Sequence, residues 1–231
     1  MRHIPSSDTA HAGVLTFEEA LQPVADDYDR DRWLYVPDHY SEYRYILGTK
    51  GSRPLICIGI NPSTAAPDRL DNTLKSAQRI ALFNGYDSFI MFNVYAQRAT
   101  LPDDMEKELN PLLHRENMKA FEWVLSQAEQ PAVWAAWGSL IMKRPYLPAC
   151  VKDMTEIGSR HDARWYTAGP RSKQGHPHHP LYLKKDSVLD PFTDLKEYLD
   201  SISPPAAIFP PCRHFSPCRP QGGSKSKFTG E

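Results

Sequence analysis

Polar side chains that are able to bind a ligand follow three apolar runs of the sequence and fill one later loop. An asparagine amide has a hydrogen-bond donor and an acceptor, so it can match the amide-like edge of another molecule. An arginine close to such an asparagine adds a partner for an anion such as phosphate. A histidine can donate a hydrogen bond to negative charge that develops during a reaction. The residues of these kinds, with the hydroxyl groups beside them, are Asn61, Ser63, Thr64, Asn93, Arg98, Thr100, Ser139, His176, His178 and His179.

The stretch from Leu55 to Ala65, LICIGINPSTA, is the most informative part of the chain. The run Leu55 to Ile60 is continuously apolar and predicts a buried strand. Residues 61–64 are typical of a turn, so their side chains should lie where the strand ends. In open α/β sheets ligands bind at this carboxyl edge of the strands. The alternative interpretation is a strand followed by an ordinary turn that binds nothing.

Further apolar runs and amphipathic stretches alternate along the chain. Strands are expected at 88–94, 132–137 and 164–168, and helices at about 70–84, 111–128 and 192–202. Residues 43–47 should form another strand and pair with 55–60 as a hairpin, and 181–183 is a further short apolar run. Alternation of this kind predicts a three-layer α/β fold, with a mostly parallel central sheet of about four strands and helices on both faces.

The composition predicts one ordinary globular domain with extensions. Of 231 residues, 41% are hydrophobic and 24% charged. We expect a flexible acidic N-terminal extension at 1–32, a single α/β domain at 33–202 and a disordered, Pro-rich basic tail at 203–231. With no long apolar run, no secretory signal and no disulfide framework among four cysteines, a cytoplasmic monomer with no membrane contact is expected.

Charge is unevenly distributed although the formal net charge is only −1. Residues 1–50 contain nine acidic and five basic residues, a net charge of −4, whereas residues 143–185 contain nine basic and three acidic residues, a net charge of +6. The basic segment could form a positive rim that binds nucleic acid or nucleotides. It could equally be a solvated surface with no such partner.

Five ordered motifs resemble a known family. They are GINPSTA at 59–65, DNT at 71–73, FNVYAQRAT at 92–100, WAAWGS at 134–139 and HPLYL at 179–183. Together they are similar to the domain of unknown function 1643 family, over about residues 43–185. This pattern adds Asp71 to the candidate ligand-binding residues and includes Arg98 and Thr100.

That family in turn resembles the uracil-DNA glycosylase superfamily, whose mismatch-specific branch has GINPG where this chain has GINPS at 59–63. The resemblance implies a glycosylase-like fold in which Asn61 positions a water, Asn93 reads the base edge and His179 supports the leaving base. The motif at 137–139 also matches. Two features depart from the pattern: the histidine motif reads HPLY and not HPSP, and no residue is an assured wedge for opening a duplex.

The resemblance therefore implies a hydrolase that breaks the bond between a base and its sugar, in nucleic acid or in a nucleotide, with Asn61 and His179 as catalytic residues. Alternatives are a non-catalytic module that binds nucleic acid or nucleotides, and a hydrolase or transferase of small nucleotides. No cofactor is expected. Zinc at His176, His178 and His179 is disfavoured because proline interrupts the group and no cysteine or carboxylate has matching spacing. Trp134 and Trp137 alternate with alanines and are expected in the core.

Overall fold

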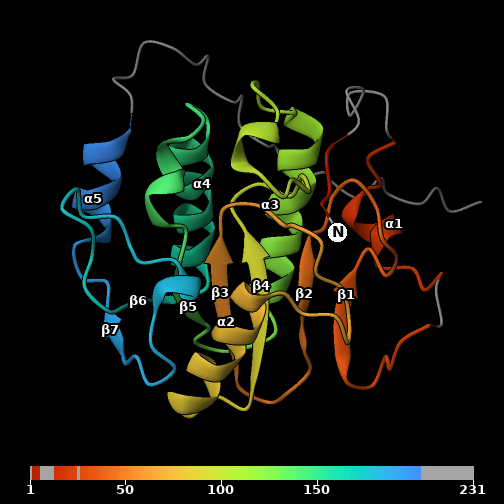
Figure 1. The fold of residues 1–231 in the computed structure, drawn as a ribbon, viewed down its shortest axis with the longest axis horizontal. Helices are drawn as coiled ribbons and strands as arrows, with labels where there is room; N and C mark the ends of the chain where they lie inside the picture. The colour runs from red at the N-terminus through yellow and green to blue at the C-terminus, as the bar shows by residue number, and fades with distance from the viewer. Residues whose placement is uncertain (1, 6–12, 25–26, 204–231) are drawn as a thin grey trace, which may run out of the picture.

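The structure is a computed structural model that describes residues 2–5, 13–24 and 27–203. Its centre is a seven-stranded sheet with the order β1-β2-β4-β3-β5-β6-β7 (Figure 1). The strands are β1 (Trp33–Val36), β2 (Ile46–Thr49), β3 (Pro54–Gly59), β4 (Ser88–Asn93), β5 (Ala132–Ala135), β6 (Arg164–Ala168) and β7 (Leu189–Pro191).

The four inner strands β4, β3, β5 and β6 run parallel, and β1, β2 and β7 join antiparallel at the two sides. The α/β prediction is therefore confirmed, and the predicted strands at 55–60, 88–94, 132–137 and 164–168 correspond to the four strands of the parallel core. The full sheet is mixed and has seven strands rather than about four. The parallel core places the carboxyl ends of β3, β4 and β5 at one edge.

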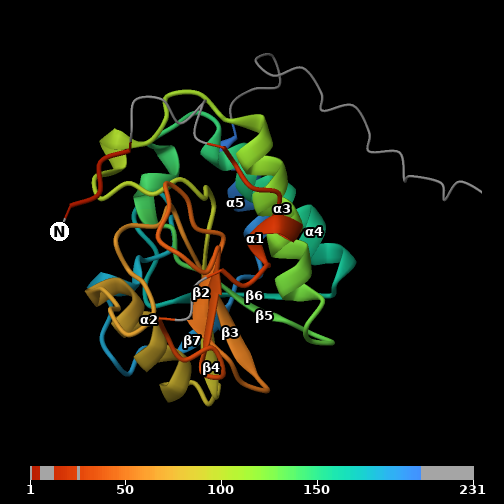
Figure 2. The same cartoon turned by 90° about the vertical axis from the view of Figure 1, so that its right-hand side faces the viewer.

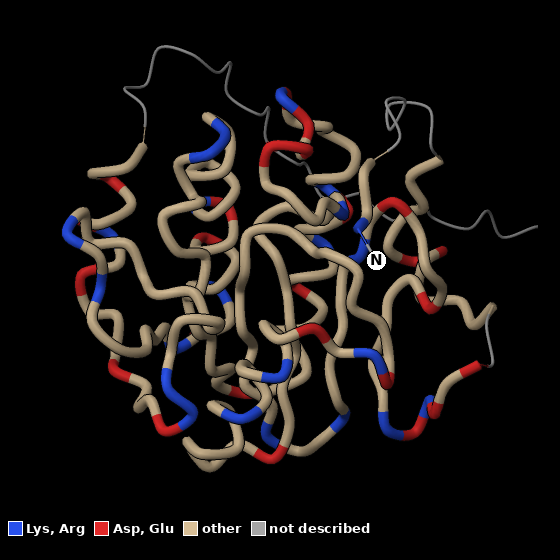
Figure 3. The backbone as a smooth tube through the Cα atoms, in the orientation of Figure 1, with Lys and Arg blue, Asp and Glu red and all other residues tan. Residues whose placement is uncertain are grey.

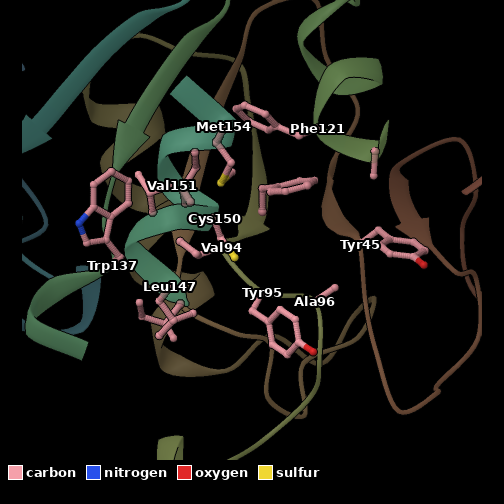
Figure 4. Close-up of a cluster of buried hydrophobic side chains, with 14 of the residues drawn as sticks. Tyr45, Val94, Tyr95, Ala96, Phe121, Trp137, Leu147, Cys150, Val151 and Met154 are labelled. Carbon is pink, nitrogen blue, oxygen red and sulfur yellow. The ribbon is translucent and has the colours of Figure 1, made fainter. Parts of the chain in front are cut away.

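Helices cover both faces of the sheet, but unequally (Figure 2). On one face lies α2 (Asn72–Phe83), whose apolar side packs on alternate strand residues such as Leu55 and Cys57. The other face is covered by the helices α1 (Phe17–Ala20), α3 (Pro111–Leu125), α4 (Leu147–Arg160) and α5 (Leu195–Ile202). There, α4 contributes Leu147, Cys150, Val151 and Met154 to the cluster that contains Trp137 and Val94 (Figure 4).

Local signals at the helix ends explain why α2 and α3 form where the sequence predicts them. Asn110 caps α3 by accepting hydrogen bonds from the backbone N–H groups of Leu112 and Leu113, and Pro111 occupies the first helical position. Asp71 caps α2 through the N–H of Leu74. Gly85 follows the last residues of α2 with a φ of 80°, a conformation that favours glycine.

The expected hairpin between residues 43–47 and 55–60 is wrong. Strand β2 pairs with β1 and β4, and β4 lies between β2 and β3. Neighbouring strands are about 4.8 Å apart, so the short segment between Thr49 and Pro54 can pass over one strand. Gly48 permits close pairing with β4, because a Cβ there would lie 2.3 Å from the carbonyl oxygen of Phe89.

Several elements were not predicted. They are β1, β7, α1, α4 and the 3-10 helices η1 (Pro102–Asp104) and η2 (Gly138–Met142), and the short apolar run at 181–183 lies partly in the 3-10 helix η3 (Pro180–Tyr182). Within the segment 1–32, Phe17 and Ala20 of α1 are buried against the domain. The expected tail lies outside the described residues, apart from Ser203. No helix in the described part of the chain is long and apolar enough to cross a membrane.

Candidate functional site

The loops that follow β3, β4 and β5 meet the loop before η3 at the carboxyl edge of the parallel core. Gly59 pairs with Asn93 in the β3–β4 register. A Cβ at Gly138, just after β5, would lie 3.5 Å from the Cβ of His179. Asp71, at the start of α2, influences the pKa of His179 through its charge. The four segments that carry these residues therefore lie at one edge of the sheet, and Ser139 is exposed next to Gly138.

Asn93 is the most unusual of these residues. Its side chain is 1% exposed, and neither the amide nitrogen nor the amide oxygen has a hydrogen-bond partner among the described residues. The amide lies over Gly59, where a Cβ would be 3.2 Å from its oxygen. An unpaired buried amide is costly by about 1–3 kcal/mol, so it is a reason to expect a ligand.

Asn61 has a partly structural task. Its amide nitrogen donates hydrogen bonds to the carbonyl oxygens of Ala99 (2.8 Å) and Pro62 (3.0 Å). These bonds join the loop after β3 to the loop after β4. The amide oxygen is left as the atom that can accept a hydrogen bond from a water or a ligand.

His179 is arranged as a neutral hydrogen-bond donor. Its Nδ1 accepts a hydrogen bond from the backbone N–H of Leu181 at 3.4 Å, which places the ring proton on Nε2. Burial lowers the pKa of His179 below its usual value of 6.5, and the negative charge of Asp71 opposes this effect. At neutral pH the ring is therefore uncharged and carries one N–H.

The replacement Asp71→Asn is expected to lower the pKa of His179 further. The carboxylate favours the charged imidazolium, so its removal leaves burial unopposed, while asparagine still caps α2. A pH titration of the histidine C–H signals by NMR, with His179→Asn used for assignment, measures the shift. An unchanged or raised pKa would contradict this arrangement.

For the same reason, protonation of His179 should lower the free energy of unfolding of the protein. Because the pKa is lower in the folded state than in the unfolded state, the unfolded chain binds more protons between the two values. The contribution of neutral His179 to the free energy of unfolding is present above pH 6.5, and it is lost as the pH falls through the folded-state pKa. His179→Asn should make the loss of stability on acidification correspondingly smaller.

Two buried arginines lie behind the loop at 61–66. Arg98 is 0% exposed and donates hydrogen bonds to the carbonyl oxygens of Ser63 and Ala65 and to the hydroxyl of Tyr35. Arg44 is 1% exposed and donates to the same carbonyl of Ala65 at 3.2 Å. Burial and the neighbouring charge of Arg98 lower the pKa of Arg44 to about 9, so the side chain of Arg44 remains positive at neutral pH, and burial also lowers the pKa of Arg98.

This arrangement changes what Arg98 can do. The sequence predicts it as a direct ligand for an anion, but its Nη1 and Nη2 groups are already bound to the loop carbonyls and to Tyr35, and its guanidinium lies 4.3 Å from the ring centre of Tyr40. Its contacts fix the loop that carries Ser63 and Thr64. Arg44 was not predicted at all, although a charged residue inside the aromatic run Tyr43 to Tyr45 was a visible signal.

The side chains of Ser63 and Thr100 contact each other, and His3 near the N-terminus is hydrogen-bonded to Thr100. The two hydroxyl oxygens are 3.3 Å apart, and the backbone N–H of His3 donates to the hydroxyl of Thr100 at 2.8 Å. The N–H of Thr100 returns a bond to the carbonyl of His3. Both Ser63 and Thr64 are half-buried. Of the predicted residues, Ser63 and Thr100 therefore form a second group that the residues near Met1 partly cover.

The basic residues of 143–185 do not gather into the expected positive rim, and lysines and arginines as a whole are spread over many parts of the backbone (Figure 3). Arg164 begins β6 and lies at the opposite, amino edge of the sheet. Arg160 pairs with Glu122 on α3, and Arg171 pairs with Asp194. These three arginines belong to α4, to β6 and to the loop after β6, and they therefore lie on different sides of the domain.

The other histidines of the loop have local structural partners. Nδ1 of His176 is hydrogen-bonded to the hydroxyl of Tyr198 at 3.0 Å, and this hydroxyl accepts a hydrogen bond from Nε1 of Trp137. His178 contacts the carbonyl of Pro170. Within the described ranges, no group of three or more histidine, cysteine or acidic side chains could hold a metal ion. Trp134 and Trp137 lie in the core, as expected.

The fold and this edge define the protein as an α/β protein whose polar loops gather at the carboxyl end of a parallel core, where open sheets bind ligands. The chain belongs to the family described as "Protein of unknown function (DUF1643)", which matches residues 44–181. The family resemblance predicted from the five motifs is thereby confirmed. No curated protein and no solved structure matches the chain.

Proposed function

We propose that the protein is a glycosylase-like hydrolase that breaks the bond between a base and its sugar, in nucleic acid or in a nucleotide. The observation that carries this proposal is the buried, unpaired amide of Asn93 at the carboxyl edge of β4. A base with an amide-like edge would supply the donor and the acceptor that this amide lacks. The likeness of the motifs at 59–63, 137–139 and 179–180 to those of uracil-DNA glycosylases supports the same conclusion.

The other residues have matching roles. Negative charge grows on the departing base as the glycosidic bond breaks, and the Nε2–H of a neutral His179 can donate a hydrogen bond to it. The amide oxygen of Asn61 would orient the attacking water, because its nitrogen is bound to the backbone. A neutral amide is a weak base, so its role is positioning rather than proton abstraction.

Arg98 and Arg44 would act through the loop that they hold. Two positive charges close to a developing anion lower its energy even without direct contact, and more so where water is excluded. Ser63, Thr64, Thr100 and Ser139 would contact the sugar or a phosphate at the rim, and the carboxylate of Asp71 would accept a hydrogen bond from a sugar hydroxyl. The negative charge of the substrate would also offset the repulsion between the two guanidinium groups.

The test is release of free base, measured by mass spectrometry, from a panel of uracil-containing, damaged and modified oligonucleotides and nucleosides. We expect release from at least one substrate and a loss of at least 100-fold for Asn93→Ala and His179→Ala. His178→Ala is the matched control, because His178 lies beside His179 and binds the carbonyl of Pro170 instead.

Two outcomes would overturn the proposal. If no substrate in the panel releases a base while nucleic acid still binds, the protein is a binding module and not an enzyme. If release occurs but the Asn93 and His179 variants retain it, catalysis belongs to other residues. Circular dichroism of each variant separates lost chemistry from lost folding.

A further inference from the structure

A cavity lies at the opposite edge of the sheet from Asn93 and His179. Its volume is about 340 Å³, and it opens between the starts of the parallel strands β3, β5 and β6. Its walls include Arg53, Tyr86, Gln130, Arg164 and Tyr166, and no acidic side chain lines it. The volume is at the lower end of the range for pockets that hold small organic ligands.

Two arginines of this cavity have no carboxylate partner among the described residues. Arg164 donates to the side-chain oxygen of Gln130, and Arg53 donates to the carbonyl of Gly85. The guanidinium of Arg53 lies 5.6 Å from the ring centre of Tyr86. Each guanidinium has five N–H donors, so most of them stay available to an anion.

The two tyrosines face the same space. Burial raises the pKa of Tyr86, Tyr166 adds to this rise, and the charges of Arg53 and Arg164 oppose it, so the four groups lie close to one another. Neither tyrosine hydroxyl has a hydrogen-bond partner in the described part of the chain. The rings offer flat apolar faces, and the hydroxyls offer further hydrogen bonds.

The walls are fixed before any ligand arrives. Asn84, at the end of α2, donates to the carbonyls of Ile80 and Ser187 and accepts from the N–H of Leu189. Asp87 accepts hydrogen bonds from Ser52 and from the backbone of Arg53. The loops that carry Arg53 and Tyr86 are therefore each held in place by several hydrogen bonds.

Two arginines and two tyrosines line the cavity, and no acidic residue does. We therefore propose that this cavity binds a small phosphate monoester that carries a planar ring, such as a nucleoside monophosphate. Arg53 and Arg164 bind the phosphate, as guanidinium groups commonly do. Tyr86 and Tyr166 pack against the ring. The site is separate from the proposed catalytic edge and does not depend on the proposed reaction.

The test is calorimetric titration of the full chain at low ionic strength with adenosine monophosphate, inorganic phosphate and adenosine. We expect the nucleotide to bind at least tenfold more tightly than either fragment, because only the nucleotide engages both the arginines and the tyrosines. The double variant Arg53→Gln/Arg164→Gln should bind it at least tenfold more weakly, and Tyr86→Ala should weaken it as well. Arg160→Gln is the matched control, since Arg160 is exposed and pairs with Glu122 outside the cavity.

Asn93→Ala distinguishes the two edges of the sheet. Nucleotide binding that survives this replacement and is lost in the double arginine variant belongs to the cavity and supports the proposal. Binding that is lost in Asn93→Ala, or that persists in the double arginine variant, would overturn it. Undetectable binding at millimolar nucleotide would overturn it too.

Discussion

Replacing Asn93 by alanine is expected to leave the free energy of unfolding unchanged or to raise it by up to about 2 kcal/mol, whereas replacing Asn117 by alanine should lower it by about 2 kcal/mol. Both asparagines are fully buried, at 1% and 0% exposure. They differ in their hydrogen bonds. The same substitution should therefore have opposite or clearly different effects at two neighbouring sites.

The reason is the pairing of each amide nitrogen. Asn117 on α3 donates hydrogen bonds to the carbonyl oxygens of Asn93 (3.1 Å) and Val94 (3.3 Å), so its loss leaves these acceptors without that donor. The side chain of Asn93 makes no such bond in the described structure. Its removal abolishes an unpaired buried amide, which offsets the small space that alanine leaves.

Urea denaturation of the two variants and the wild type measures the difference. A loss of 2 kcal/mol or more for Asn93→Ala would show that its amide is paired in solution, and the argument for a ligand there would fail. If Asn93→Ala is stable but releases no base, the amide is kept for function at some cost in stability.

The parts of the fold that could be predicted are those with strong local signals. Three of the four parallel strands, β3, β4 and β5, consist almost entirely of apolar residues, as buried strands require, whereas β6 begins with the exposed Arg164. Helices α2 and α3 have capping residues, Asp71 and Asn110, together with a regular apolar face. By contrast, β7 has three residues, one of them a proline, and shows no alternation to recognise.

Helix α4 was missed although it contains a helical pattern. Its buried residues include Leu147, Cys150, Val151, Met154 and Ile157, at typical helical spacing. No side chain caps its start, and Pro148 and Gly158 obscure the pattern. The misassigned hairpin has a different cause. The insertion of β4 between β2 and β3 depends on contacts between segments about 40 residues apart, which a local pattern does not contain.

The edge of the sheet at which the candidate residues lie could be predicted from the sequence, whereas the hydrogen bonding of their side chains could not. Polar residues after strand ends indicated the carboxyl edge. Whether an amide is paired, as in Asn61, or unpaired, as in Asn93, depends on the three-dimensional arrangement. The burial of Arg44 and Arg98 behind the loop is likewise a consequence of packing, since arginines are usually exposed.

The second large effect is expected for Arg98→Ala, which should lower the free energy of unfolding by about 3 kcal/mol or more. The guanidinium holds the carbonyls of Ser63 and Ala65 and the hydroxyl of Tyr35, and alanine would leave these groups without that donor. Relief of the repulsion with Arg44 reduces the loss but does not remove it.

Three further variants identify the cause of this loss. Arg98→Lys keeps the charge but has a single nitrogen in place of the planar fork, so it should recover only part of the loss. Arg160→Ala, at a side chain that is 55% exposed, should change stability by no more than about 0.5 kcal/mol. Urea denaturation gives all three values. If Arg98→Met is as stable as the wild type, the arginine is not needed to hold the loop, and its burial would then have to be explained by a bound anion.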